Sequence, residues 1–340
     1  MALQSSGAIS LNDVNVELGN SGTAYITMGS AAVRDLFGVA SGAISLSDGY
    51  GASAVEPWMG DRGLFGGGIS SYAFQNVIQY ITITSTGNAT DFGDLTLARE
   101  TLGACSSGTR GVWGGGYSNP KSDVLDYVTI ASTGNATDSG NLLGPTSNIG
   151  ALSNTTRGLW HGGHDGTSPI DVLQYITIAS TGNATDFGNL TVSGQHLGSC
   201  SSATRGVVAG NRTASQNVID YVTIATTGNA TDFGDLTVNS QTPTGCSDGS
   251  RGVFGSRRNS ALNVIDYITI ASTGNATDFG DLTVSRSSTA ACGNSTRGVW
   301  AGGFQETNTI DYVTIATTGN ATDFGDLLGV LQTAAGCAGD

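Results

Sequence analysis

The sequence predicts a mainly β protein, a six-bladed β-propeller of four-stranded blades preceded by a small α/β module. One segment recurs six times at intervals of 45 to 48 residues, and each repeat holds four short β-favouring stretches. Glycine supplies 52 of the 340 residues, about twice its usual share of about 7%. A period near 46 residues with four strands per repeat is typical of a propeller blade.

The recurring segment defines the limits of the propeller. Its copies begin at Tyr80, Tyr127, Tyr175, Tyr221, Tyr267 and Tyr312. Each copy continues through Thr-Gly-Asn-Ala-Thr-Asp to Phe-Gly, except that Ser139 once replaces the phenylalanine. An Arg-Gly element precedes every copy, at Arg62, Arg110, Arg157, Arg205, Arg251 and Arg297. We therefore assign residues 57–340 to the propeller and residues 1–56 to a separate module.

The second repeat illustrates the strands that we expect in each blade. We predict strands over residues 102–106, 111–115, 124–131 and 137–143, from their β-favouring residues and the turn residues between them. Glycine and asparagine in 132–136 indicate a tight turn between the last two strands. The Gly-Gly pair after the second strand, the tyrosine of the third and the aromatic residue of the fourth resemble the kelch repeat. Phenylalanine stands here where a kelch repeat usually has tryptophan.

Ring closure is predicted from one position that lies five residues before each repeat arginine. Cysteine or leucine occupies it in five repeats, at Cys105, Leu152, Cys200, Cys246 and Cys292. Before Arg62 the position falls on Pro57, which fits poorly inside a β-ladder. The missing innermost strand reappears around Cys337 at the C-terminus. We therefore expect this C-terminal strand to complete the blade of Arg62, with a ring of buried, reduced cysteines near the axis.

Polar residues that recur in every repeat are interpreted as structural. The six repeat arginines are matched by aspartates at Asp91, Asp138, Asp186, Asp232, Asp278 and Asp323. A group required identically in all blades suits Arg–carboxylate or Arg–backbone bonds between blades. The six Asn-Ala-Thr triplets match a glycosylation pattern, but their position favours a role as turn formers. Asp91 and Asp94 lack the dense ligand loop of calcium motifs, so we expect no metal.

One face of the propeller is predicted to carry the function. Up-and-down strands place the first and third turns of each blade on one face, where the repeats are nearly identical, and the other loops on the opposite face, where they differ. Variable positions on a repeated scaffold suit specific binding. The candidate binding residues are Tyr72, Phe74, Tyr117, Lys121, His164, Asp165, Arg212, Arg257, Arg258, Phe304 and Glu306. The loops that connect one blade to the next contribute further residues to this face: Arg99, Glu100, Gln195, His196 and Arg286. Neutral drift of solvated loops is the alternative.

Composition excludes several classes of function. A formal charge of −14 opposes binding to nucleic acid, and no apolar run of about 18 residues predicts a membrane span. Only four glutamates and three histidines occur, and no nucleophile elbow or phosphate loop is present. Some six-bladed propellers are glycosidases, whose chemistry needs an asymmetric pocket of carboxylates. We therefore expect no enzyme activity and no cofactor.

The first 56 residues are predicted to form a small α/β module that needs support from a partner. We expect helices over 11–18 and 31–37, a strand over 23–28 and a further turn over 45–48, with Ser10 and Ser30 as helix caps. The string SGAISLNDVNVELG…SGAISLSDGYGAS, within residues 5–53, resembles an N-terminal module of tailed-bacteriophage virion proteins. That resemblance implies an anchor to the particle.

Together these features predict a phage virion structural protein, tail-associated in a fibre or baseplate. Residues 1–56 would attach to other virion proteins, and the propeller would display a face for a host-surface glycan or protein. We expect a virion location after synthesis in the host cytoplasm, with several copies per particle. The alternatives are a capsid or neck decoration or spacer protein, and, with less support, a kelch-like intracellular adaptor or a glycosidase.

Overall fold

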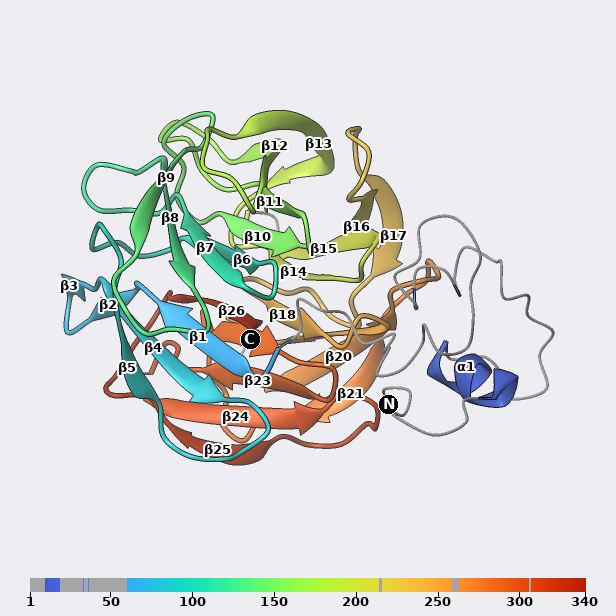
Figure 1. The fold of residues 1–340 in the computed structure, drawn as a ribbon. Helices are drawn as coiled ribbons and strands as arrows, with labels where there is room; N and C mark the ends of the chain where they lie inside the picture. Colours follow the sequence, from blue (N-terminus) through green and yellow to red (C-terminus); the bar gives the residue numbers. More distant parts are fainter. Residues whose placement is uncertain are drawn as a thin grey trace. The chain divides into compact units, whose positions relative to one another are not determined.

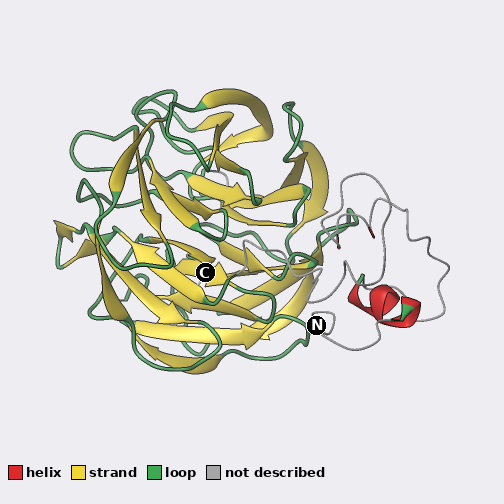
Figure 2. Ribbon diagram, in the orientation of Figure 1, coloured by secondary structure: helices red, strands yellow, loops and turns green. Residues whose placement is uncertain are grey.

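A computed structural model describes residues 10–18, 33, 36, 60–213, 216–258, 263–305 and 307–340. The chain divides into two compact units, Met1–Glu56 and Pro57–Asp340. The second unit is almost entirely strands and loops, as the secondary-structure colouring in Figure 2 shows. It forms the predicted six-bladed propeller, and Figure 1 shows the blades arranged around one axis.

Each blade is a four-stranded antiparallel sheet whose strands follow one another from the axis outward. The first blade contains β26 (Ala335–Gly339), β1 (Arg62–Gly66), β4 (Val77–Thr82) and β5 (Thr90–Asp94). The second contains β6 (Gly103–Ser106), β7 (Arg110–Gly114), β8 (Val124–Thr129) and β9 (Thr137–Asn141). The third contains β10 (Gly150–Ser153), β11 (Arg157–His161), β12 (Ile170–Thr177) and β13 (Thr185–Gly194). The strands predicted for the second repeat are therefore confirmed, with ends that differ by one or two residues.

The remaining three blades repeat this order. The fourth contains β14 (Gly198–Ser201), β15 (Arg205–Asn211), β16 (Gln216–Thr223) and β17 (Thr231–Asp235). The fifth contains β18 (Thr244–Ser247), β19 (Arg251–Gly255), β20 (Val264–Thr269) and β21 (Thr277–Asp281). The sixth contains β22 (Ala290–Gly293), β23 (Arg297–Ala301), β24 (Thr309–Thr314) and β25 (Thr322–Asp326). A short hairpin, β2 (Ile69–Ser70) and β3 (Ala73–Phe74), extends from the first blade.

The C-terminal strand closes the ring as predicted. Strand β26 pairs antiparallel with β1, with Arg62 opposite Gly339 and Leu64 opposite Cys337. The indole of Trp113 in the second blade donates to the carbonyl of Ala335, 3.2 Å away. The first blade thus joins the two ends of the propeller sequence, and its inner edge is covered.

A ring of cysteine–glycine contacts surrounds the axis. All five cysteines are buried free thiols. A Cβ atom added at Gly158 would lie 2.6 Å from the Sγ atom of Cys105 in the preceding blade, and one added at Gly298 would lie 2.7 Å from that of Cys246. Only glycine fits this close approach, which explains why Arg-Gly recurs in every repeat. Leu152 fills the same place against Gly206.

The outer strand of every blade is covered by the neighbouring blade. The turn between the third and fourth strands of the next blade lies along this outer strand and hydrogen-bonds to it. The amide of Gly134, for example, donates to the carbonyl of Phe92 at 2.8 Å, and the side chain of Asn135 accepts from the amide of Asp94 at 3.1 Å. The backbone bond recurs at all six seams, with donors Gly87, Gly134, Gly182, Gly228, Gly274 and Gly319. The Gly-Asn-Ala triplets therefore form turns, and these turns also join adjacent blades by hydrogen bonds.

The six repeat arginines bind backbone carbonyls rather than carboxylates. Each donates to an isoleucine carbonyl of the next blade at 2.7 to 3.0 Å. Each guanidinium also lies 4.0 to 4.9 Å from the ring centre of the repeat tyrosine in its own blade, which adds a cation–π attraction. The matched aspartates, such as Asp91, are exposed. The expected Arg–backbone bond is confirmed, whereas the Arg–carboxylate alternative is not what these arginines form.

A second polar contact crosses each seam in two matched forms. Four seams pair a threonine of one blade with a buried aspartate of the next: Thr96 with Asp126, Thr191 with Asp220, Thr237 with Asp266, and Thr283 with Asp311. At the other two seams, leucine replaces the threonine and glutamine replaces the aspartate. The side-chain oxygens of Gln174 and Gln79 accept from the amides of Leu143 and Leu328, both at 2.7 Å. Threonine therefore always faces aspartate, and leucine always faces glutamine. An aspartate that faced leucine would lose the hydroxyl donor that threonine supplies.

In the N-terminal unit, the structure describes one helix, α1 (Leu11–Glu17). Ser10 and Asp13 cap it reciprocally: the amide of Asp13 donates to Ser10 Oγ at 3.2 Å and the amide of Ser10 donates to Asp13 Oδ2 at 2.7 Å. The first predicted helix is thus confirmed. The predictions for 23–28, 31–37 and 45–48 lie outside the described residues, apart from Val33 and Leu36, which are helical.

Deletion of residues 332–340 is expected to abolish the single cooperative thermal transition, because it removes the strand that covers β1 and the acceptor of Trp113. Circular dichroism during heating measures this. Cys337→Ala keeps the strand and should melt in one transition at a lower temperature. An unchanged melting curve for the deletion would contradict ring closure by β26.

Gly158→Ala is expected to destabilise the propeller by about 1–3 kcal/mol, because its methyl group would overlap the Cys105 thiol. Equilibrium denaturation of G158A, C105A and the double variant measures the coupling. The glycine substitution should cost less in the C105A background, and exposed Gly329→Ala should have little effect. If the free-energy changes of the two single substitutions add up to that of the double variant, the two residues do not interact, and the prediction is wrong.

Candidate functional site

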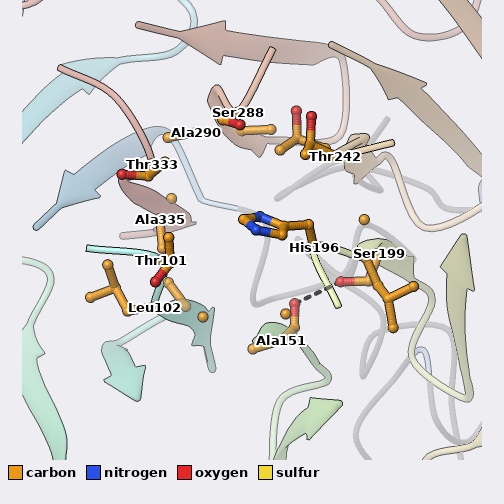
Figure 3. Close-up of a pocket in the computed structure, with 18 of the residues that line it drawn as sticks. Thr101, Leu102, Ala151, His196, Ser199, Thr242, Ser288, Ala290, Thr333 and Ala335 are labelled. Carbon is orange, nitrogen blue, oxygen red and sulfur yellow. Dashed lines mark hydrogen bonds between the residues drawn. The ribbon is translucent and has the colours of Figure 1, made fainter. Parts of the chain in front are cut away.

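The innermost strands surround an axial channel that opens on the loop face, the face with the variable loops. Two hollows of about 120 and 80 Å³ follow this channel. The larger one lies where the chain enters the innermost strand of each blade, and Figure 3 shows the residues that line it. Small side chains from the inner strands, such as Ala104, Ala151 and Ser199, leave this space open.

One residue from each blade forms the channel mouth. These mouth residues are Thr101, Asn148, His196, Thr242, Ser288 and Thr333. All six have left-handed backbone conformations, with φ between 55° and 59°. A β-branched threonine rarely adopts this conformation, so the mouth carries backbone strain, which often accompanies functional sites. The sequence analysis named only His196 among them; their shared position just before each innermost strand was the signal that it missed.

A second ring of residues surrounds the mouth. These rim residues are Ile69, Tyr117, His164, Arg212, Arg258 and Phe304. The amide of each donates to the carbonyl of the residue that precedes a mouth residue, at distances of 2.8 to 3.1 Å. Five of the six belong to the predicted binding residues, so the fold gathers these variable side chains around one opening.

Three aromatic candidates, Tyr72, Phe74 and Tyr117, come from the first and second blades. Phe74 and Tyr117 meet edge to face with ring centres 5.7 Å apart. Tyr72 lies at the tip of the β2–β3 hairpin, where 94% of its surface is exposed. An exposed tyrosine offers both an apolar face and a polar hydroxyl to a partner.

Lys121, His164 and Asp165 form a second group. Lys121 Nζ lies 3.0 Å from His164 Nδ1 and donates to the His164 carbonyl at 3.2 Å. Burial lowers the pKa of Lys121, and the charge of Asp165 acts in the opposite direction. Backbone amides of Ser168 and Thr167 hold the pKa of Asp165 below its ordinary value. The cation of this group therefore has a carboxylate nearby.

A cationic corner, defined as His196, Arg212, Arg258 and Phe304, occupies the rim and mouth of the fourth to sixth blades. Arg212 Nη1 lies 2.8 Å from His196 Nε2, and the Arg258 guanidinium lies 5.6 Å from the centre of the Phe304 ring. Burial, followed by the charges of Arg212 and Arg258, lowers the pKa of His196 to about 3. Burial and the charge of Arg258 also lower the pKa of Arg212. The imidazole is therefore neutral at pH 7.

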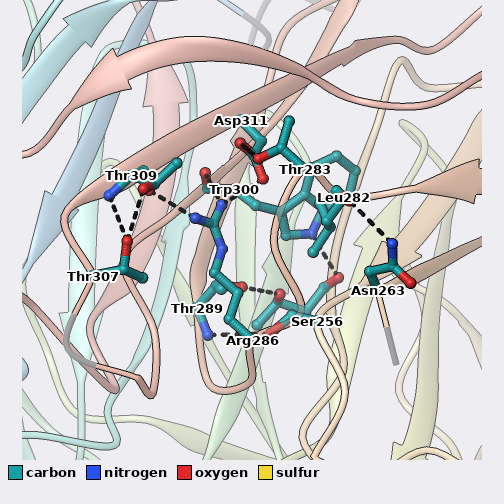
Figure 4. Close-up of polar contacts among 11 residues, drawn as sticks. Ser256, Asn263, Leu282, Thr283, Arg286, Thr289, Trp300, Thr307, Thr309 and Asp311 are labelled. Atoms are coloured by element: carbon teal, nitrogen blue, oxygen red, sulfur yellow. Dashed lines mark hydrogen bonds and ion pairs between the residues drawn. The ribbon is translucent and has the colours of Figure 1, made fainter. Parts of the chain in front are cut away.

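Three other arginines of the loops lie inside the protein and form ion pairs. Arg257 pairs with Asp266 at 2.5 Å, Arg99 with Asp126 at 2.9 Å and Arg286 with Asp311 at 2.9 Å, all with fully buried side chains. Figure 4 shows Arg286 between Asp311 and the Trp300 carbonyl. Arg257 was expected on the binding face, but the structure places it in this interior pair. In the loop that precedes the fifth blade, Ser240 stands at the position that Arg99 and Arg286 hold in their loops. Arg257 therefore neutralises Asp266 in their place. Glu306 lies outside the described residues.

Groups that could support catalysis or metal binding are sparse in the described chain. Within it, no cluster of three or more His, Cys, Asp or Glu side chains is placed to hold a metal ion. Burial raises the pKa of the Cys246 and Cys337 thiols to about 12, so they stay protonated at neutral pH. Among the described residues, no helix is long and apolar enough to cross a membrane.

Comparison with known proteins gives no further assignment. No protein-family model matches the chain, and no curated protein is significantly similar to it.

Acid is expected to destabilise the protein partly through His161, which is fully buried with neither ring nitrogen hydrogen-bonded within the described structure. Burial lowers its pKa from 6.5 to about 3. The unfolded chain takes up a proton below pH 6.5 and the folded chain does not, so stability falls as pH decreases through this window. We expect His161→Ala to reduce the loss between pH 7.5 and 4.5 by about 2–3 kcal/mol.

Denaturation at several pH values measures this difference. Val208→Ala truncates a buried side chain that does not titrate, and its acid dependence should match that of the unmodified protein. Equal acid dependence of H161A and the unmodified protein would contradict the lowered pKa of His161.

Proposed function

We propose that the chain is a non-catalytic structural protein of a tailed-bacteriophage particle. Residues 1–56 attach it to other virion proteins, and the loop face of the propeller binds the host surface. The attachment rests on the resemblance of residues 5–53 to a phage virion module. The binding role rests on the channel mouth and its rim.

The observation that carries the binding proposal is the difference between the two faces of one scaffold. On one face, the same Gly-Asn-Ala turns recur at every seam and are used in contacts between blades. On the other, equivalent backbone positions carry Ile69, Tyr117, His164, Arg212, Arg258 and Phe304 around a single opening. Aromatic and arginine side chains are enriched at the centres of binding interfaces. A rim with these residue types and a hollow centre suits recognition of a partner.

Electron cryomicroscopy of particles that carry the chain tests the arrangement. We expect residues 1–56 to contact another virion protein and the loop face to point outward. Density with the loop face buried against virion proteins would contradict receptor binding and favour a spacer or decoration role. Density that leaves residues 1–56 without a contact would contradict attachment.

Competition measures the binding role directly. The purified full chain is expected to reduce adsorption of the particle to its host cells. Tyr72→Ala with Tyr117→Ala should weaken this competition, because both rings lie on the loop face. Thr181→Asp, in an exposed turn of the opposite face, provides the control and should compete as the unmodified chain does. Equal competition by all three proteins would contradict the proposed face.

A further inference from the structure

The cationic corner differs from the rest of the rim in its balance of charge. Among the described residues, no carboxylate forms an ion pair with Arg212 or Arg258. The other described arginines have partners: the repeat arginines bind carbonyls, and Arg99, Arg257 and Arg286 pair with buried aspartates. In a chain of net charge −14, two neighbouring guanidinium groups with no such partner in the described part of the chain are an unusual concentration of positive charge.

The polar groups of this corner are arranged as donors. Arginine has no acceptor, so its contact with His196 Nε2 requires the lone pair of that nitrogen. In the neutral ring the proton then lies on Nδ1, which makes no hydrogen bond with another described residue. Figure 3 shows the imidazole extending into the hollow of the mouth. One N–H of His196, and the N–H groups of the two arginines that bond to no described residue, are therefore available to a ligand.

Two hydroxyl groups with no partner in the described structure belong to residues that line the same hollow as His196. Thr242 and Ser288 line the same hollow, with 3% and 8% of their surfaces exposed. Neither hydroxyl has a hydrogen-bond partner within the described structure. A buried polar group without a partner costs free energy, and a ligand hydroxyl could supply the missing bond.

An apolar surface completes the corner. Phe304 has 39% of its surface exposed, and its ring lies next to Arg258. The electron-rich face of an aromatic ring attracts groups with partial positive charge, such as the C–H groups of a sugar ring.

We propose that the cationic corner binds a sugar that carries an oxyanion, a carboxylate or a phosphate group. The forked guanidinium groups of Arg212 and Arg258 would bind the oxyanion, His196 Nδ1–H would add a donor, and the hydroxyls of Thr242 and Ser288 would bind sugar hydroxyls. This inference rests on the proposed function of the loop face and specifies its ligand as an acidic surface glycan.

Isothermal titration calorimetry of the full chain tests the site with defined probes. Oligogalacturonate supplies carboxylates, glucose 1-phosphate supplies a phosphate, and a neutral galacto-oligosaccharide supplies neither. We expect at least one acidic probe to bind and the neutral one to bind at least tenfold more weakly. Arg212→Ala and Arg258→Ala should each weaken acidic binding at least tenfold. Their melting curves establish whether they remain folded.

Two controls separate a specific site from general charge. Thr181→Asp changes the net charge by the same amount as Arg212→Ala, on the opposite face, and should leave binding unchanged. Arg212→Lys keeps the charge but loses the fork, so it should bind more weakly than the unmodified chain. Equal affinity for acidic and neutral probes, or an equal effect of T181D and R212A, would overturn the inference.

Competition with intact particles distinguishes this inference from the proposed function. If R212A/R258A competes for host cells as well as the unmodified chain while Y72A/Y117A does not, the oxyanion site is wrong and the receptor-binding face stands. If both double variants fail to compete, and acidic probes bind as expected, both proposals are supported.

Discussion

The propeller depends on covering the outer strand of every blade with a turn from the next. A four-stranded sheet on its own would present an unpaired outer strand to other chains. Here the amide of a turn glycine reaches the carbonyl of that strand at 2.7 to 2.9 Å at all six seams, and the last seam joins Gly87 to Phe324. The Arg–tyrosine contacts and the cysteine–glycine packing strengthen the same seams. Stability is therefore shared around the ring, and closure by β26 holds the first and last blades to the same geometry.

Repetition made most of this architecture predictable. Six copies of one motif fixed the number of blades, and Pro57 in place of a cysteine indicated that the innermost strand of the first blade comes from the C-terminus. Repetition also identified the arginines and the Gly-Asn-Ala turns as structural. Their partners were not predictable, because the isoleucine carbonyls that accept from the arginines carry no side-chain signal. A backbone acceptor in another blade is revealed only by the three-dimensional structure.

Prediction was weaker where the repeats differ. Variable loops indicated a binding face, and the fold gathers Tyr117, Arg212 and Phe304 around the channel. The sequence did not separate Arg257 from Arg258, although one lies in a buried ion pair and the other on the rim. Arg257 reaches Asp266 of its own blade, whereas Arg258 lies near His196 of another blade, and nothing in the two adjacent arginine codes distinguishes these directions. The mouth residues could have been identified from their shared position just before each innermost strand, whereas their left-handed backbone conformation is seen only in the structure.

The threonine–aspartate and leucine–glutamine contacts make the order of the blades significant. Each blade has an aspartate or a glutamine at the seam with the preceding blade, and a threonine or a leucine at the seam with the following blade. Two blades are compatible neighbours only if threonine meets aspartate or leucine meets glutamine. The fourth blade, with Asp220 and Thr237, and the fifth, with Asp266 and Thr283, each match themselves. A tandem copy of either would form a satisfied seam, whereas a copy of the second blade would set Leu143 against a second Asp126. Growth of this ring by duplication is thus chemically permitted at the fourth and fifth blades and penalised at the others.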